Sequence, residues 1–307
     1  MASPEPEPAV AIVGASGFIG RHLAAALASA AIPVSSFSRA VPFTVNGSRR
    51  GQCTPFQVVF YLATSVRPAD AEHSADLVAA DHKRFCLALD ELGWLDRPPV
   101  VVLASSGGKV YDTNSPPPYS EQSPTWSAFA YGSAKLALES ELADRELPSA
   151  VLRLANVYGP GQQTGSGQGV VAHWLAAAAR GKPLILFGDP RARRDYVYVD
   201  DVVAAMTGIY HRVGCDPLAR AHGLPTLNIG SGTPTSLAEL HGLIASVTGR
   251  QLDIQRVAAR EVDRQDAWLD TTAAARLLGW QARTSLARGL TRTWHSIGQE
   301  DQRARQD

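Results

Sequence analysis

Residues 10–20 read VAIVGASGFIG, an apolar run followed by a turn with three glycines and then by the start of a helix. Four successive apolar residues, Val10 to Val13, are typical of a parallel strand that is buried on both faces. The Ala/Leu-rich stretch from Ile19 to Ala30 favours a helix. Glycines let the backbone of such a turn approach a phosphate, and the helix N-terminus offers free amides and a positive dipole end. The stretch therefore predicts a strand–turn–helix unit that binds a dinucleotide.

Further apolar runs repeat this pattern along the first half of the chain. Their length suits buried strands, and residues 75–92 between two of them show helical periodicity. Strands that are apolar on both faces and alternate with helices indicate an α/β fold, a Rossmann-type doubly wound parallel sheet. The further strand-like runs are 32–37, 58–63, 100–104 and 150–154.

Beyond Pro160 the elements become shorter and the pattern changes, which predicts a smaller C-terminal lobe that binds the substrate. We assign residues 9–160 to the dinucleotide-binding domain, with returning segments at about 194–230. The substrate-binding lobe then comprises residues 161–193 and 231–298.

The composition argues against several classes of protein. The 307 residues carry 29 Lys+Arg and 29 Asp+Glu, so no strongly basic field points to nucleic acid as a partner. No apolar run approaches the ~20 residues that span a bilayer, and the N-terminus lacks an apolar signal core. The three cysteines (Cys53, Cys86 and Cys215) and the eight histidines show no paired metal-ligand spacing, so we expect no metal site. We expect a cytoplasmic protein with reduced thiols and no membrane partner.

Tyr131 and Lys135 lie four residues apart in the segment YGSAK, downstream of the glycine turn. On a helix this spacing places both side chains on one face. An ammonium near a phenol favours the phenolate, so Lys135 would lower the pKa of Tyr131 from its ordinary value of about 10. Such a phenol can exchange a proton with a carbonyl or alcohol while a nicotinamide exchanges hydride with the adjacent carbon.

The end of the second strand indicates which nicotinamide cofactor is bound. An acidic residue there would accept the ribose 2′-hydroxyl of NAD, whereas an arginine suits the 2′-phosphate of NADP. This chain has Ser38 and Arg39 at that place and no carboxylate nearby, which favours NADP(H) and leaves NAD(H) open. Only 19 residues, Arg39 to Gln57, precede the next strand, so we expect a strand of the adenine-side half-sheet to be missing or reduced and a loop in its place.

The ordered motifs resemble those of the extended short-chain dehydrogenases/reductases, in the group of NAD(P)-dependent nucleotide-sugar epimerases, dehydratases and ketoreductases. The resemblance covers residues 10 to about 294. It implies a nucleotide-sugar substrate and is compatible with the homodimer that this family often forms. The motifs are GASGFIG (14–20), SSGGKVY (105–111), YGSAK (131–135), RLANVYGPG (153–161), GD (188–189), RDYVYVDD (194–201) and LNIGSG (227–232).

The resemblance also implies the catalytic residues. Tyr131 would be the acid/base, and Lys135 would bind the nicotinamide ribose while lowering the pKa of Tyr131. The family usually places a catalytic Ser or Thr where this chain has Gly107. Ser106 could replace that hydroxyl if the two glycines after it move the backbone, although Ser106 could equally just end its strand.

Further binding residues follow from the same resemblance. Tyr158 and Asn156 would line the region of the nicotinamide and the substrate diphosphate. Arg194 would clamp the nucleotide diphosphate, and Arg260 with Asp263 would hold the nucleotide end. Asp81 receives no role. The other expected cofactor contacts are Gly14, Ser16, Gly17, Phe18, Ile19, Gly20, Ser38, Arg39, Leu62 and Ala63.

The reaction we expect is reduction of a nucleotide-activated, dTDP-linked 4-keto-deoxysugar by NADPH, with Tyr131 as proton donor. Three features favour it: Ser38–Arg39, the absence of an acid after the second strand, and the similarity of residues 167–203 to antibiotic-sugar ketoreductases. The alternative is an NAD-dependent UDP-hexose 4-epimerase. A dehydratase is disfavoured because Gly108–Lys109 replaces its acidic pair, and a catalytically weak nucleotide-binding regulatory protein is disfavoured by the intact Tyr131 and Lys135.

Overall fold

The computed structural model describes residues 9–45, 48–49, 56–64, 66, 71–164, 169–259 and 266–303. The chain forms two compact units. The first unit contains Met1–Val110, Trp126–Arg153 and Val203–Leu227, and the second contains Tyr111–Thr125, Leu154–Val202 and Asn228–Asp307.

The first unit is built on a parallel sheet, as predicted. Strand β1 pairs in parallel with β2 on one side and with β5 on the other, and β5 pairs in parallel with β6. Every residue of β5 is buried, which explains why its sequence does not alternate and is apolar at every position except Gln57. The strand order is β7-β6-β5-β1-β2. Strand β11 (Leu227–Ile229) lies next to β7, and of its residues only Leu227 belongs to this unit. The strands are β1 (Ala9–Val13), β2 (Val34–Phe37), β5 (Phe56–Tyr61), β6 (Val100–Ser106) and β7 (Ser149–Leu154).

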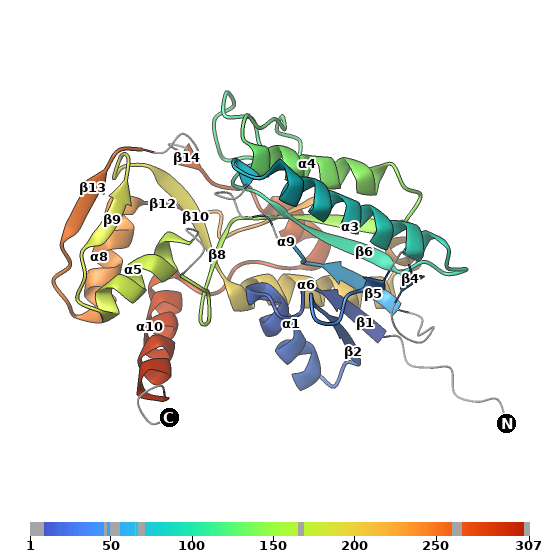
Figure 1. The fold of residues 1–307 in the computed structure, drawn as a ribbon, viewed down its shortest axis with the longest axis horizontal. Coiled ribbons are helices and arrows are strands. Elements are labelled where there is room, and N and C mark those ends of the chain that lie inside the picture. Colours follow the sequence, from blue (N-terminus) through green and yellow to red (C-terminus); the bar gives the residue numbers. More distant parts are fainter. Residues whose placement is uncertain are drawn as a thin grey trace. The chain divides into compact units, whose positions relative to one another are not determined.

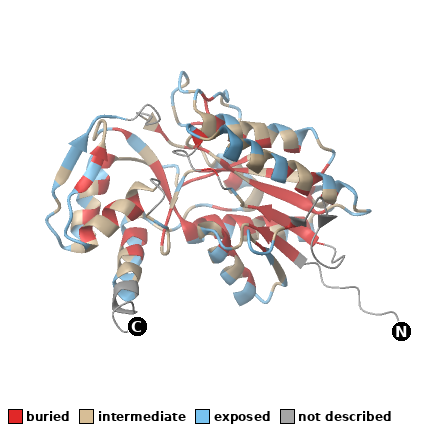
Figure 2. Cartoon of the chain, in the orientation of Figure 1, coloured by how far each residue is buried: buried red, intermediate tan, exposed pale blue. Residues whose placement is uncertain are grey.

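Helices cover both faces of this sheet. Helices α3 and α4 lie side by side on one face and α1 lies on the other (Figure 1). Phe85 and Leu89 of α3 and Leu142 of α4 join the buried strands in one apolar core, seen as the red interior in Figure 2. No helix within the described ranges is long and apolar enough to cross a membrane. The helices are α1 (Phe18–Ser29), α3 (Ala75–Gly93), α4 (Ala130–Ala143), α6 (Val199–Cys215) and α7 (Pro217–His222).

The connection between β2 and β5 is short, and among its described residues it adds no strand to the parallel sheet. It contains only β3 (Thr44–Val45) and β4 (Ser48–Arg49), which pair with each other in antiparallel fashion. As far as its residues are described, the parallel sheet ends at β2, which is compatible with the expectation that a strand of the adenine side is missing or reduced. The small hairpin itself was not expected, because two-residue strands leave no periodic pattern.

The second unit combines short strands with helices. Strand β10 pairs with β12 in antiparallel fashion and with β14 and β8 in parallel. Strands β9 and β13 form a separate parallel pair. The elements are β8 (Asn156–Tyr158), α5 (Val170–Ala179), β9 (Leu184–Phe187), β10 (Arg193–Tyr198), β12 (Pro234–Ser236), α8 (Leu237–Thr248), β13 (Ile254–Val257), β14 (Asp266–Ala267), α9 (Thr272–Leu278) and α10 (Leu286–Arg303).

The two units divide the chain differently from the predicted domains. Residues 111–125 and 154–160, which we placed in the nucleotide domain, belong to the second unit. The cause is backbone pairing: the amide of Tyr119 donates to the carbonyl of Trp268, the amide of Asp270 donates to the carbonyl of Tyr119, and β8 pairs with β10. Such long-range pairing is invisible to a reading of local pattern.

Helix α10 contacts Tyr158 closely in the core of the second unit. Tyr158 is 1% exposed, and its hydroxyl donates to the carbonyl of Leu286 at 3.3 Å. Gly289 faces the ring, and a Cβ atom added there would lie 2.1 Å from the Tyr158 hydroxyl and 2.7 Å from Cζ. The packing of α10 therefore depends on glycine at this position.

We predict that Gly289→Ala lowers the free energy of unfolding by about 1–3 kcal/mol, because the buried ring of Tyr158 has to move. Gly298→Ala on the same helix is the matched control, since nothing lies within 4 Å of a Cβ added there. Helix propensity should make this control neutral to stabilising, by about 0.5–1 kcal/mol. Urea denaturation of both variants measures the difference, and equal stabilities would contradict the packing.

Candidate active site

The glycine turn is held between the ends of β2 and β5. The amides of Gly14 and Ala15 donate to the carbonyl of Phe37 at 2.8 and 2.9 Å. Gly14 has a φ of +99°, and a Cβ atom there would lie 2.7 Å from the amide nitrogen of Ala63 and 2.9 Å from the carbonyl carbon of Leu62. Leu62 and Ala63, both expected cofactor contacts, thus lie directly against the turn.

The N-terminus of α1 follows this turn directly. Gly17 is the N-cap, it makes no side-chain capping hydrogen bond, and the first turn carries no acidic residue. A Cβ at Gly20 would lie 2.2 Å from the carbonyl oxygen of Gly14, so the turn can close only around glycine. Ser16, Phe18 and Ile19 lie in the same turn and first helical residues. This backbone cradle with a positive helix end suits the pyrophosphate of a dinucleotide.

The turn after β2 places Arg39 in solvent beside this cradle. The amide of Ser38 donates to the carbonyl of Val41 at 2.8 Å, which closes a tight turn. Arg39 is exposed, and Phe37, whose carbonyl holds the glycine turn, is buried against Phe43. The guanidinium is therefore available to an anionic group at the ribose end of a bound dinucleotide.

Helix α4 carries Tyr131 and Lys135 on one face. The ammonium nitrogen of Lys135 lies 5.9 Å from the centre of the Tyr131 ring and donates to the carbonyl of Ala104 at 3.2 Å. Gly132 permits close packing of α4 against the segment that follows β6, because a Cβ there would lie 2.3 Å from the carbonyl oxygen of Lys109 and 2.1 Å from the hydroxyl of Ser127. The structure thus brings the two predicted catalytic side chains together at the C-terminal end of β6.

Burial dominates the ionisation of this pair. It raises the pKa of Tyr131 to about 12, opposite to the lowering that we expected from the ammonium. It lowers the pKa of Lys135 to about 8, although the carboxylates of Asp81 and Glu139 act in the opposite direction. At neutral pH the phenol therefore holds its proton and the ammonium is largely charged, a state suited to proton donation.

A buried ion pair fixes the next turn of α4. Glu139, four residues after Lys135, accepts two hydrogen bonds from Nε of Arg153 and one from Nη2 at 2.6 Å. The side chains are only 9% (Arg153) and 11% (Glu139) exposed. The hydroxyl of buried Ser105 also donates to Glu139. The sequence analysis missed this network, for which the spacing of Glu139 from Lys135 was the only local signal.

Ser105 and Ser106 therefore differ in their surroundings. The hydroxyl of Ser105 is bonded to Glu139 on α4, whereas Ser106 is the half-buried last residue of β6. Because side chains alternate along a strand, Ser106 points to the opposite face from Ser105. The role of Ser106 as the catalytic hydroxyl stays a prediction.

Asp81 of α3 connects the end of β5 to the catalytic pair. Its Oδ2 accepts from the hydroxyl of Thr64 at 3.0 Å and from the amide of Val66 at 3.1 Å. Its charge favours the ammonium of Lys135. Asp81 thus both holds the loop after Ala63 and supports the charge on Lys135, a role that the sequence analysis did not assign.

The predicted substrate residues lie in the second unit. The side-chain amide of Asn156 donates to the carbonyl of Asp195 at 2.8 Å, and a guanidinium nitrogen of Arg194 donates to the carbonyl of Arg193 at 2.9 Å. Tyr158 is enclosed in the core. Arg260 and Asp263 lie outside the described residues.

Asp195 organises the loop beside these residues and was missed by the sequence analysis. Its carboxylate is 1% exposed and accepts from the amides of Ser231, Gly232 and Leu269 and from the hydroxyl of Ser231. Burial raises the pKa of Asp195 and these hydrogen bonds oppose the rise. Asp195 therefore fixes β10, the 231–232 loop and Leu269 together.

We predict that Glu139→Gln lowers the free energy of unfolding by about 3 kcal/mol, because the buried guanidinium of Arg153 loses its counter-charge. Glu146→Gln, at an exposed position just after α4, is the control and should change stability by less than about 0.5 kcal/mol. Chemical denaturation measures both variants, and equal small effects would show that the buried pair contributes nothing.

Lys135 should also leave a signature in the pH dependence of stability. Its pKa falls from 10.5 to about 8 on folding, so the unfolded chain binds more protons between these values and stability rises with pH across that window. We predict that Lys135→Met removes a rise of about 2–3 kcal/mol between pH 8 and 10. Lys83→Met, at an exposed position on α3, should keep it. Denaturation at several pH values tests this, and parallel wild-type and Lys135→Met profiles would contradict it.

Comparison with known proteins identifies relatives of this chain. The model of the NAD dependent epimerase/dehydratase family matches residues 10–214. A UDP-glucose 4-epimerase of Mycolicibacterium smegmatis is 34% identical over 241 residues, which cover 77% of this chain and 74% of that protein. A dTDP-4-dehydro-6-deoxyglucose reductase of Escherichia coli is 26% identical over 245 residues, which cover 78% and 75%.

Solved structures share the fold over nearly the whole chain. The UDP-glucose 4-epimerase of Thermotoga maritima, crystallised with UDP-glucose, gives a TM-score of 0.77 at 26% identity, covering 95% of this chain and 99% of that one. MoeE5 in complex with UDP-glucose and NAD gives 0.79 at 27% identity with the same coverage. The family predicted from the motifs is thus confirmed: the chain belongs to the NAD-dependent epimerase/dehydratase family and is an enzyme of the extended short-chain dehydrogenase/reductase type.

Proposed function

We propose that this enzyme oxidises and re-reduces carbon 4 of a nucleotide-activated hexose, and thereby acts as an NAD-dependent nucleotide-sugar 4-epimerase. The observation that carries the proposal is the pairing of Tyr131 with the buried Lys135 at the end of β6, in the same unit as the glycine turn. A phenol and an ammonium in this arrangement serve proton transfer to and from a sugar oxygen.

The nicotinamide, Tyr131 and Lys135 would each have one task in the reaction. A bound nicotinamide would supply the hydride acceptor and donor. Tyr131 holds its proton in the free enzyme and would lose it to solvent before the reaction. As the phenolate it would take the proton of the sugar 4-hydroxyl while hydride leaves carbon 4, and as the resulting phenol it would return that proton when hydride comes back to the opposite face. Lys135 would stabilise the phenolate before and after this exchange, since its charge is maintained by Asp81 and Glu139.

Several relatives are 4-epimerases, and on this support we propose epimerisation ahead of the reduction that we expected from the sequence. UDP-glucose 4-epimerases of Mycolicibacterium smegmatis and of Methanocaldococcus jannaschii are 34% and 31% identical to this chain. A dTDP-L-rhamnose 4-epimerase of Burkholderia thailandensis is 37% identical over a shorter stretch of 177 residues. An epimerase reduces and re-oxidises its NAD within each turnover, so it needs only one retained cofactor molecule. The complex of the structurally similar MoeE5 contains NAD.

The second candidate is reduction of a 4-keto-deoxysugar by NADPH. The exposed guanidinium of Arg39 at the end of β2, with no carboxylate in residues 34–45, favours a 2′-phosphate. The dTDP-4-dehydro-6-deoxyglucose reductase of Escherichia coli supports this candidate at 26% identity. Asn156, Arg194, Arg260 and Asp263 remain our proposed substrate contacts in either case.

The two candidates differ in what happens to the cofactor, and this is the test. For an epimerase we predict that the purified enzyme interconverts UDP-glucose and UDP-galactose with catalytic amounts of NAD. The absorbance at about 340 nm, where reduced nicotinamide absorbs, should show no net change. Tyr131→Phe should lower kcat by about 10²–10⁴-fold while dinucleotide binding is retained. Stoichiometric NADPH consumption with a dTDP-4-keto-6-deoxysugar, and none of the interconversion, would give the reductase first place.

Arg39 provides a separate test of cofactor choice. If it binds a 2′-phosphate, Arg39→Ala should weaken NADPH binding by about tenfold or more and leave NADH binding unchanged. Arg97→Ala, at an exposed position after α3, is the matched control. Isothermal titration of both dinucleotides measures the ratio, and equal loss of NADH and NADPH would contradict the assignment.

A further inference from the structure

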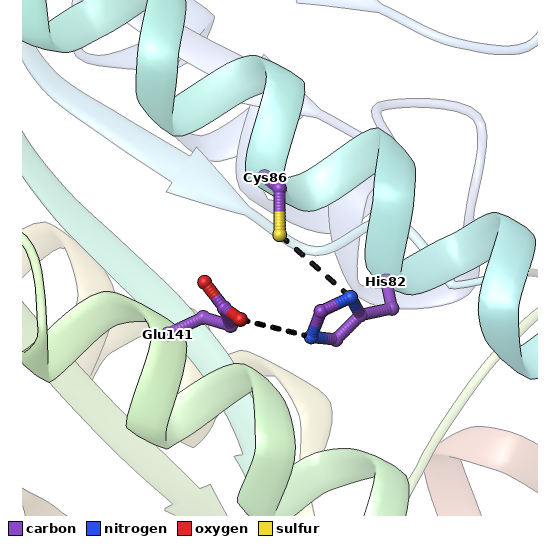
Figure 3. Close-up of side chains that lie close together, drawn as sticks. All are labelled: His82, Cys86 and Glu141. Atoms are coloured by element: carbon purple, nitrogen blue, oxygen red, sulfur yellow. Dashed lines mark hydrogen bonds and ion pairs between the residues drawn. The ribbon is translucent and has the colours of Figure 1, made fainter.

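Three potential metal ligands meet between α3 and α4 (Figure 3). His82 and Cys86 lie one helical turn apart on α3, and Glu141 faces them from α4. The sulfur of Cys86 lies 3.7 Å from Nδ1 of His82, and Nε2 of His82 lies 3.3 Å from a carboxylate oxygen of Glu141. One ligand atom from each residue lies within 4.8 Å of the other two.

This geometry suits a tetrahedral zinc ion. Zinc lies at about 2.3 Å from a thiolate sulfur and about 2.0–2.2 Å from imidazole nitrogen and carboxylate oxygen, so neighbouring ligand atoms are roughly 3.3–3.7 Å apart. The sulfur of Cys86 and Nδ1 of His82 already lie at such a separation. The Glu141 oxygen contacts Nε2 instead, so the carboxylate has to swing toward the Nδ1 side before all three residues can bind one ion. A thiolate with an imidazole favours zinc over calcium or magnesium, which prefer oxygen ligands alone.

Arg145 occupies only one of the two carboxylate oxygens of Glu141. Arg145 bonds to Oε2 of Glu141 at 2.5 Å and to Asp90 of α3 at 3.1 Å, whereas Oε1 faces His82. The hydrogen bond from Arg145 holds the pKa of Glu141 below its ordinary value, so the carboxylate stays charged. An outer partner of this kind orients a ligating carboxylate.

Zinc binds a cysteine as the thiolate, so the proton of Cys86 leaves when the ion binds. The side chains of His82 and Glu141 are 37% and 29% exposed, so water can reach a fourth coordination position.

We propose that His82, Cys86 and Glu141 bind one zinc ion with water as fourth ligand, and that this ion links α3 to α4. Glu141 lies ten residues after Tyr131 on the same helix, so the ion stabilises the helix that carries the catalytic pair. The sequence analysis expected no metal because the third ligand comes from a distant helix. This proposal does not rest on the epimerase assignment.

Cobalt and zinc titrations test the site. We use the full chain without an affinity tag, with Cys53→Ser and Cys215→Ser to remove the other thiols. We expect one Co²⁺ per chain with a thiolate-to-cobalt absorption band and tetrahedral visible bands, which Zn²⁺ displaces. Excess Zn²⁺ should raise Tm by a few degrees, and a chelator should reverse the shift.

Variants decide whether the three residues are the ligands. Cys86→Ser should abolish the thiolate band, and His82→Gln and Glu141→Gln should weaken Co²⁺ binding at least tenfold. Asp90→Asn is the matched control, because it loosens Arg145 without removing a ligand and should retain binding. Absence of the thiolate band in the parent protein, or its persistence in Cys86→Ser, would overturn the proposal. Dinucleotide binding by each variant confirms that it is folded, and the chelator-reversible Tm shift of the parent needs no variant.

Discussion

The burial of the Lys135 ammonium against the end of β6 is the constraint on which the catalytic region depends. A charged amine in an apolar setting is unfavourable unless it has partners. Here it donates to the carbonyl of Ala104 and experiences the charges of Asp81 and Glu139. Gly132, next to Tyr131, lets α4 pack closely against Lys109 and Ser127 of the segment after β6. This packing helps to position Tyr131.

The surroundings of α4 explain why so much charge is gathered in one place. Glu139, which supports Lys135, is itself neutralised by Arg153 of β7. Two residues after Glu139, Glu141 faces His82 and Cys86 of α3, and Arg145, just after the end of α4, bonds to Asp90 of α3. The helix therefore uses one face to hold the catalytic ammonium and its flank to contact α3. Removing a single buried member leaves a charge uncompensated, which is more destabilising than the pair is stabilising.

In the second unit a buried carboxylate has a similar structural role. Asp195 is buried, and amides from two distant segments together with the hydroxyl of Ser231 satisfy it. It keeps β10 in place, the strand that also contains Arg194 and Tyr196. In both units, then, the residues proposed to act on the substrate are positioned by buried charges whose partners come from elsewhere in the chain.

The sequence alone determined the parallel sheet, the glycine turn, the shortened segment after Arg39 and the pairing of Tyr131 with Lys135. Each depends on residues that are neighbours along one strand, one turn or one helix, so periodicity and spacing reveal them. The tertiary structure alone decided that burial raises the pKa of Tyr131 and that Asp81 and Glu139 support Lys135. It also decided the boundaries of the two units and the meeting of Glu141 with α3. These depend on dielectric surroundings and on contacts between distant segments, which only the folded chain creates.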